Sequence, residues 1–332
     1  MQKLSEIVRV DDLKKYFPVQ KSVLEQMVTR KKSYVKAVDN IAFSIRKKEI
    51  FTLAGESGCG KTTTGRMILR LLEPTSGKIY FDGEDITDLK GEKLRLLRRK
   101  MQVIFQDPYA SLNPRMRIGD AIGHPLEIYG LANREERAKM VLEVLAKVGL
   151  TPPEQLVNLY PLNLSGGQRQ RVALARSIIL KPEFMVADEP VSMIDVSLRT
   201  TIIDLMLDFR RELGLTYLFV THDLAVAKYI SDRIAIMYLG KIVEIGTKQE
   251  IFSTPLHPYT QALLMAIPVP NPERKRKGME LKGEVPSAIN IPSGCRFHPR
   301  CPYAEKECVE RETELVSVTP THMVACNLKN AQ

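Results

Sequence analysis

The segment Gly55-Glu56-Ser57-Gly58-Cys59-Gly60-Lys61-Thr62 fits the pattern G-x-x-x-x-G-K-[ST]. An apolar strand precedes it and an amphipathic helix follows it, the context in which this pattern binds phosphate. Its glycines let backbone N–H groups point into one concavity at a helix N-terminus. We expect Lys61 to reach the β- and γ-phosphates of a nucleotide, Thr62 to ligate Mg²⁺, and Cys59 to have no redox role. The nucleotide-binding residues predicted here are Gly55, Ser57, Gly58, Cys59, Gly60, Lys61, Thr62 and Thr63.

Two acidic residues end a second apolar strand, Phe184-Met185-Val186-Ala187-Asp188-Glu189. At a strand tip beside the phosphate loop, Asp188 can hold Mg²⁺ directly or through water. Glu189 would then face the γ-phosphate and polarise the attacking water. Such a strand end is weakly specific alone, but downstream of a phosphate loop it indicates nucleotide hydrolysis.

Strands and helices alternate around these segments. Runs of β-branched and aromatic residues predict strands at Glu6–Val10, Ala42–Ile45, Ile50–Leu53, Lys78–Phe81, Gln102–Phe105, Phe184–Ala187, Thr216–Val220, Arg233–Met237 and Lys241–Ile245. Helical periodicity covers Lys61–Leu72, Arg134–Val148, Gly167–Leu180, Asp195–Glu212 and Leu224–Ile230. The later strands alternate with helices, as in a parallel sheet. The strand-poor stretch 107–165 resembles a helical insertion between two strands.

The composition is that of a folded protein, with 332 residues, 44% of them hydrophobic, and a net charge of +10. Collagen-like, low-complexity and disordered classes are therefore excluded. No apolar run approaches the roughly 20 residues of a membrane-spanning helix. The N-terminus lacks the apolar stretch of a signal peptide, so we expect a cytosolic location. The charge indicates an anionic partner such as nucleotide, nucleic acid or a membrane surface, without choosing among them.

The segment Leu164-Ser165-Gly166-Gly167-Gln168 begins a predicted helix. With the phosphate loop and the acidic strand end, it makes the sequence resemble the nucleotide-binding subunits of ABC transporters over nearly the whole chain. In that family this signature binds the γ-phosphate of ATP held by the opposite subunit. The residue types agree, since serine caps helix N-termini and glycines allow close approach to an anion. The resemblance assigns ATP contacts to Ser165, Gly166, Gly167, Gln168 and Asp195.

Other site residues follow from the resemblance one position at a time. Gln106 resembles the glutamine that senses Mg²⁺ and the attacking water, and His222 the histidine that contacts the γ-phosphate. Tyr16 matches the aromatic residue that stacks on adenine, with Phe17 and Tyr34 as rivals and core packing as the alternative role. The expected catalytic set is therefore Glu189, His222 and Gln106.

One segment departs from the family pattern. Where the family usually has Ser-Ala-Leu-Asp, this chain has Ser192-Met193-Ile194-Asp195. The departure puts the dimer-contact geometry in question, while the retained serine and aspartate do not exclude hydrolysis.

Further motifs narrow the resemblance to importers of dipeptides and oligopeptides. They are Leu71-Leu72-Glu73-Pro74-Thr75-Ser76-Gly77, the run from Gln106 to Pro114, His257-Pro258-Tyr259-Thr260, and Gly294-Cys295-Arg296-Phe297-His298-Pro299-Arg300-Cys301-Pro302. The spacer between Phe17 and Ala37 resembles the F-type partner of the paired D and F subunits. The same subfamily includes importers of oligosaccharides and of nickel, so these cargoes stay open.

Four cysteines crowd the C-terminal tail, with spacing C-x5-C-x6-C-x17-C at Cys295, Cys301, Cys308 and Cys326. This is not the C-x2-C pairing usual in structural zinc sites. Four thiolates can hold a cubane iron–sulfur cluster. Subfamily members with this tail can carry a [4Fe–4S] cluster, so the resemblance implies one here, with zinc or unligated thiols as alternatives. A metal could supply folding free energy to a short tail. We expect His298 and His322 to be surface residues or to lie behind the ligands.

The sequence therefore predicts an α/β P-loop NTPase of ABC type with an antiparallel β subdomain, a helical insertion and a small Cys-rich tail. We expect an ABC ATPase domain at 1–267 and a linker plus four-Cys tail at 268–332, with the linker rich in proline and carrying the basic run Arg274–Lys277.

The resemblance implies ATP, Mg²⁺ and several protein partners. These are a related ATPase subunit forming a heterodimer, or a second copy forming a homodimer, two integral membrane permease subunits, and indirectly an extracytoplasmic substrate-binding protein. The chain would then be peripheral, at the cytoplasmic face of the cell membrane. A rival is a soluble ABC ATPase acting on nucleic acid, but the long coiled coil, zinc insertions or second cassette of such proteins are missing. A second rival, an iron–sulfur regulator with a vestigial ATPase, conflicts with the intact Lys61, Asp188, Glu189 and His222.

Overall fold

The computed structural model describes residues 5–19, 33–267, 281 and 283–329. The predicted linker at 268–280 and most of the spacer between Phe17 and Ala37 lie outside the described residues. Two compact units form, each assembled from separate stretches of the chain. The first unit contains Arg46–Glu49 and Asp88–Phe219, and the second contains Glu6–Ile45, Ile50–Thr87 and Val220–Gln332.

The second unit contains an antiparallel sheet with strand order β2-β1-β4-β5. Its strands are β1 (Glu6–Pro18), β2 (Tyr34–Arg46), β4 (Ser76–Phe81) and β5 (Glu84–Asp85). In the register of β1 and β4, Val8 lies opposite Phe81 and Val10 opposite Ile79. All four side chains are buried, so one face of this sheet packs on a core. The expected antiparallel β subdomain is confirmed.

A second sheet of the same unit has the order β11-β12-β10-β9-β3. Strand β3 (Ile50–Ala54) runs parallel to β9 (Arg233–Tyr238), and β9 pairs antiparallel with β10 (Lys241–Thr247). The residues of β3 are all buried, as expected for a strand covered on both faces. Helices α2 (Lys61–Ile68), α10 (Leu224–Ile230), α11 (Lys248–Ser253) and α12 (Pro258–Met265) belong to this unit.

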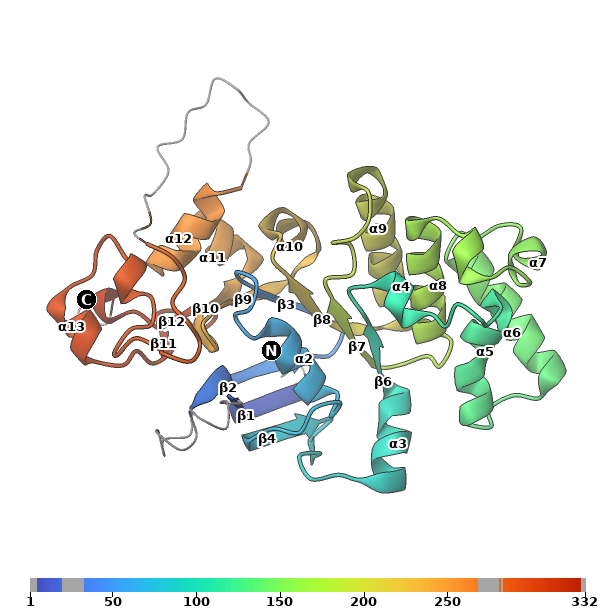
Figure 1. Cartoon of the computed structure of the whole chain (residues 1–332), viewed down its shortest axis with the longest axis horizontal. Coiled ribbons are helices and arrows are strands. Elements are labelled where there is room, and N and C mark those ends of the chain that lie inside the picture. The colour runs from blue at the N-terminus through green and yellow to red at the C-terminus, as the bar shows by residue number, and fades with distance from the viewer. Residues whose placement is uncertain (1–4, 20–32, 268–280, 282, 330–332) are drawn as a thin grey trace, which may run out of the picture. The chain divides into compact units, whose positions relative to one another are not determined.

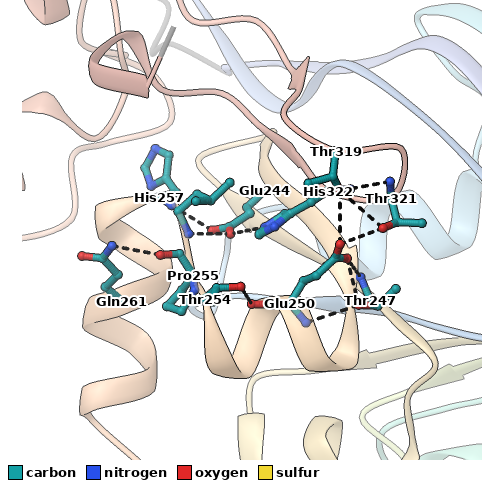
Figure 2. Close-up of polar contacts among 11 residues, drawn as sticks. Glu244, Thr247, Glu250, Thr254, Pro255, His257, Gln261, Thr319, Thr321 and His322 are labelled. Carbon is teal, nitrogen blue, oxygen red and sulfur yellow. Dashed lines mark hydrogen bonds and ion pairs between the residues drawn. The ribbon is translucent and has the colours of Figure 1, made fainter. Parts of the chain in front are cut away.

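The C-terminal tail packs on β10 through β12 (Met323–Val324) and β11 (Val316–Ser317). Figure 2 shows the polar contacts that fasten it. Glu244 of β10 is fully buried and accepts hydrogen bonds from the backbone N–H groups of Leu256 and His257 and from Nε2 of His322. The chain meets the usual requirement that a buried carboxylate be hydrogen-bonded.

A second anchor lies beside the first. Glu250, at the N-terminus of α11, accepts hydrogen bonds from Thr247, Thr319 and Thr321 (Figure 2). Although burial opposes ionisation, these hydrogen bonds lower the pKa of Glu250 to about 2. The tail is therefore held to this unit by charge-assisted bonds at two points.

The first unit has the strand order β8-β7-β6, in which β6 (Met101–Ile104) and β7 (Phe184–Asp188) pair in parallel. Strand β8 (Thr216–Thr221) begins in this unit. Its helices are α3 (Gly91–Lys100), α4 (Pro108–Ser111), α5 (Ile118–Ile128), α6 (Arg134–Lys147), α7 (Pro153–Leu156), α8 (Gly166–Ile178) and α9 (Val196–Leu213). Figure 1 shows α5, α6 and α7, in green, gathered beside α8. In the described part of the chain, no helix is long and apolar enough to cross a membrane.

Candidate functional site

The phosphate loop joins β3 to α2 in the second unit. Gly55, Gly58 and Gly60 have φ angles of 151°, 78° and 109°, in the region that favours glycine. A Cβ atom on Gly55 would lie 2.2 Å from the carbonyl oxygen of Met237, and one on Gly60 would lie 2.1 Å from that of Ala37. Glycine is therefore required at both positions by space as well as by conformation.

Lys61 is 5% exposed, and its Nζ donates to the carbonyl oxygens of Gly55 and Glu56, both at 2.9 Å. The ammonium thus lies against the backbone of the loop it serves. Cys59 is buried, and burial raises the pKa of its thiol despite the nearby ammonium. The thiol therefore stays protonated at neutral pH, consistent with a packing role in the loop.

Two side chains that the sequence interpretation missed hold Glu56. Arg300, from the Cys-rich tail, donates to both carboxylate oxygens at 2.9 and 3.1 Å. The backbone N–H of Glu56 donates to the hydroxyl oxygen of Tyr259 at 3.0 Å. The motifs containing Arg300 and Tyr259 were noted in the sequence, but no local signal predicts that they contact the loop.

Tyr16 lies near the end of β1 and is half-buried. Its hydroxyl donates to Asp39, and the ammonium of Lys36 lies 5.5 Å from its ring centroid. Burial and the hydrogen bond to Asp39 raise the pKa of Tyr16 to about 12. The rival aromatics Phe17 and Tyr34 are exposed.

His222 follows β8 and is exposed in the second unit. The next residue, Asp223, caps α10 by accepting hydrogen bonds from the backbone N–H groups of Ala225 and Val226. Asp223 donates its own backbone N–H to Thr221. These contacts fix the turn that carries His222 at the strand end.

In the first unit the structure brings Glu189 and Gln106 together, because Nε2 of Gln106 donates to the Glu189 carboxylate at 3.1 Å. Asp188 is buried at the end of β7. Glu189 has a φ angle of 47°, in the left-handed region that non-glycine residues rarely adopt. Strain of this kind often accompanies function. The Ser192 hydroxyl supports the turn by donating to the Glu189 carbonyl oxygen at 3.0 Å.

Ser165 caps α8 through a reciprocal pair of hydrogen bonds. Its hydroxyl accepts from the backbone N–H of Gln168 at 3.3 Å, and its backbone N–H donates to Gln168 Oε1 at 2.9 Å. A Cβ atom on Gly167 would lie 2.9 Å from a methyl group of Leu198, so glycine permits the close approach of α9. Asp195 precedes α9 without making a side-chain cap.

The four tail cysteines are all buried, and none of the five cysteines, which all lie in the described residues, forms a disulfide. Burial and the nearby Cys326, Cys308 and Cys301 raise the pKa of Cys295 to about 11. Within the described residues, no three His, Cys, Asp or Glu side chains are grouped as a metal-ion site. The cluster and zinc predictions therefore gain no support from the geometry.

The two histidines near the cysteines have protein partners. His298 Nδ1 contacts the carbonyl oxygen of Cys295 at 2.9 Å, and His322 is buried against Glu244. His322 is therefore a structural contact and not the surface residue that was the alternative expectation.

Comparisons with known proteins agree with these motifs. Residues 38–192 match the ABC transporter family, and residues 243–308 match the oligopeptide/dipeptide transporter C-terminal region. The Bacillus subtilis oligopeptide transport ATP-binding protein AppF is 47% identical over 97% of both chains. A probable peptide ABC transporter ATP-binding protein of Sinorhizobium fredii is 43% identical over 97% of this chain and 90% of its own.

Among solved structures, the dimeric post-hydrolysis state of the ATP-binding cassette MJ0796, bound to ADP and Pi, has a TM-score of 0.64. It is 30% identical and covers 73% of this chain and 99% of its own. The fold and the motifs thus define an ABC ATPase. The chain belongs to the ABC transporter family, among the ATP-binding proteins that carry the oligopeptide/dipeptide transporter C-terminal region.

Proposed function

We propose that this chain hydrolyses ATP to power the uptake of dipeptides or oligopeptides through partner membrane subunits. One observation carries the proposal: an ABC cassette and an oligopeptide/dipeptide transporter C-terminal region occur in one chain. The relatives named as peptide transport ATP-binding proteins support the same cargo.

In this proposal the phosphate loop binds ATP, with Lys61 neutralising phosphate charge and Thr62 and Asp188 holding Mg²⁺. Glu189 orients and polarises the attacking water, and Gln106 restrains its carboxylate. The 3.1 Å contact between Gln106 and Glu189 supports this pairing. The exposed His222 completes the site as a contact for the γ-phosphate.

Two ATPase subunits would meet head to tail, so that the signature of one faces ATP on the other. The Ser165–Gln168 capping box supports this role because it orders the N-terminus of α8, where backbone N–H groups favour an anion. ATP would join the subunits, and loss of the γ-phosphate would release them. The partner is a related ATPase subunit or a second copy, and Ser192 and Asp195 would lie near their contact.

The remaining partners in this proposal are two membrane permease subunits, with an extracytoplasmic substrate-binding protein acting through them. The chain would lie at the cytoplasmic face of the cell membrane as a peripheral subunit. The ATPase domain at 1–267 would do this work, with the tail at 268–332 attached to it. The helical insertion near 111–131 would receive a cytoplasmic loop of the permease. Nucleic acid is not part of this proposal.

We also propose that Cys295, Cys301, Cys308 and Cys326 hold a [4Fe–4S] cluster. The donor set fits in kind, since all four ligands would be thiolates. All four cysteines are buried, and Cys295, Cys301 and Cys308 belong to the hydrophobic core of the second unit. The cluster would order the tail and would take no part in hydrolysis.

The proposed function is tested by co-expressing the chain with its permease and ATPase partners, reconstituting the purified complex in vesicles, and adding the substrate-binding protein on the side opposite the ATPase subunits. MgATP supplied on the side of the ATPase subunits should drive transport of a labelled peptide, and the Glu189→Gln complex should bind ATP without transport. Transport of nickel or an oligosaccharide in place of peptide would overturn the cargo assignment. Absence of ATP hydrolysis by the complete complex would overturn the function itself.

A further inference from the structure

The Cys-rich tail contributes two buried arginines to the surroundings of the nucleotide-binding motifs. Arg296 and Arg300 are each 7% exposed and flank Phe297 in the segment between Cys295 and Cys301. Both arginines and all their partners described below belong to the second compact unit. Long cationic side chains are rarely buried unless they are paired, so each contact needs an explanation.

Arg296 is linked to Tyr16 through a shared partner, Asp39. Its guanidinium donates to the carboxylate of Asp39 and to the carbonyl oxygen of Leu239. The same carboxylate accepts the hydroxyl of Tyr16, and the Lys36 ammonium lies 3.9 Å from it. Although burial opposes ionisation, the Tyr16 hydrogen bond and the Arg296 charge lower the pKa of Asp39. A chain of charge-assisted bonds thus runs from the tail to the proposed adenine-stacking ring.

Arg300 reaches the phosphate loop. It binds both carboxylate oxygens of Glu56, whose carbonyl oxygen in turn accepts from the Lys61 ammonium. The backbone N–H of the same glutamate is fixed by Tyr259. A guanidinium that makes two parallel hydrogen bonds to one carboxylate fixes the orientation of that carboxylate as well as its distance. Arg300 therefore constrains the first turn of the loop.

Aromatic packing makes this arrangement stiff. The guanidinium of Arg300 lies 5.8 Å from the Tyr238 ring centroid and 5.9 Å from that of Phe297. The ring centroids of Tyr238 and Tyr259 are 4.6 Å apart, and those of Tyr259 and Phe297 are 5.3 Å apart. Glu244 and Glu250 fasten the far end of the tail to the same unit (Figure 2). The tail segment that carries the two arginines is therefore fixed to this unit by aromatic packing, and the end of the tail by these hydrogen bonds.

We propose that the tail contributes to nucleotide binding. Arg296 positions Tyr16 through Asp39, and Arg300 positions the phosphate loop through Glu56. Both arginines would act through another residue, Asp39 or Glu56, so both are positioning residues. The proposal rests on the proposed function for the identity of the ligand. It adds that nucleotide affinity depends on a distant segment of the sequence, since the two pairs are separated by 257 and 244 positions.

The two contacts should act on different parts of the ligand. Arg296 should influence the base more than the phosphates, because its partner Asp39 accepts the hydroxyl of Tyr16. Arg300 should influence the phosphates, because its chain ends at the loop backbone and the Lys61 ammonium. If the tail only stabilised the fold, the Arg296 and Arg300 variants would show the same pattern, with both ligands weakened or neither.

The test measures binding of MgATP and of magnesium triphosphate, which lacks the base, to the purified full-length chain. Arg296→Met should weaken MgATP about fivefold and should weaken triphosphate to a smaller extent. Arg300→Met should weaken both ligands by about fivefold to tenfold. The matched control is Arg311→Met, which removes an exposed tail arginine paired with Glu307 at 3.2 Å and should change neither affinity.

A second pair of variants keeps the test valid if Arg300→Met folds poorly. Arg300→Lys keeps the charge without the fork and should recover only part of the affinity. Adding Glu56→Gln to Arg300→Met should restore stability, because the carboxylate left without its partner is neutralised, while affinity for both ligands stays low. Wild-type affinities in both arginine variants would overturn this inference alone. Failure of the wild-type chain to bind either ligand would overturn the proposed function instead.

Discussion

His257 should make the stability of this protein depend on pH between about 7 and 4. The side chain is 1% exposed, and its Nδ1 accepts the backbone N–H of Tyr259 at 3.0 Å, which caps α12. Burial lowers the pKa of His257 to about 4 despite the attraction of Glu244. The folded protein therefore holds this ring neutral at pH values where the unfolded chain protonates it.

The sign and size follow from the two pKa values. Below pH 6.5, the pKa of histidine in the unfolded chain, the unfolded state binds a proton at His257 that the folded state does not bind. The free energy of unfolding therefore decreases as the pH falls towards 4. Between pH 7.5 and 5 the loss is about 2 kcal/mol. For a chain of this length, that shift lowers the melting temperature by about 3 °C.

The variant that isolates this effect is His257→Asn, because the amide oxygen can still cap α12. Melting temperatures of the wild type and the variant are measured across this pH range without nucleotide. Between pH 7.5 and 5 the melting temperature of the variant should fall by about 3 °C less than that of the wild type, whatever the stability of the variant at pH 7.5. His124→Asn, at an exposed histidine of α5, serves as the matched control and should behave as the wild type. An equal fall in stability for His257→Asn and the wild type would refute the argument.

Three other predictions concern the site and the tail. Glu189→Gln should slow ATP hydrolysis by about 100-fold or more in a phosphate-release assay while ATP still binds, and rapid turnover would place the base elsewhere. Ser165→Ala should cost about 1 kcal/mol in an unfolding titration by removing the cap of α8, and an unchanged midpoint would show that the cap does not stabilise the helix. Chain purified without oxygen should contain iron and acid-labile sulfide, and Cys308→Ser should lower both; stoichiometric zinc with no iron would contradict the cluster.

Local sequence patterns predicted the strands and helices that carry the motifs, because those elements have regular periodicity. The helix at Leu224–Ile230 has the bounds that were expected, and β3 extends the prediction by one residue to Ala54. The first strand runs on from Val10 to Pro18. The sequence pattern did not predict this extension, because many of its residues are charged or partly exposed and show no clear alternation. Strands β11 and β12, with two residues each, are too short for any pattern to reveal.

The local geometry of the candidate site was predictable where it depends on adjacent residues. The glycines of the loop and the capping box of α8 are local, so their conformation follows from the sequence spacing. The pairing of Gln106 with Glu189 agrees with the resemblance, although 83 positions separate them. The contacts of Arg296 and Arg300 were not predicted, because an ion pair between distant positions leaves no period or motif in one sequence.

Under the proposed function, the contacts described in the second unit would serve nucleotide binding and those in the first unit would serve hydrolysis. In the second unit, Glu56 and Asp39 hold the loop and Tyr16, groups that would grip the nucleotide before any bond breaks. In the first unit, Gln106 and Ser192 hold Glu189, the group that would act on water. Interactions that are equally strong before and during the reaction change affinity, and those used only in the transition state change the rate. Because the tail contacts named above lie in the second unit, damage to the tail should mainly lower nucleotide affinity, with the rate at saturating ATP largely retained.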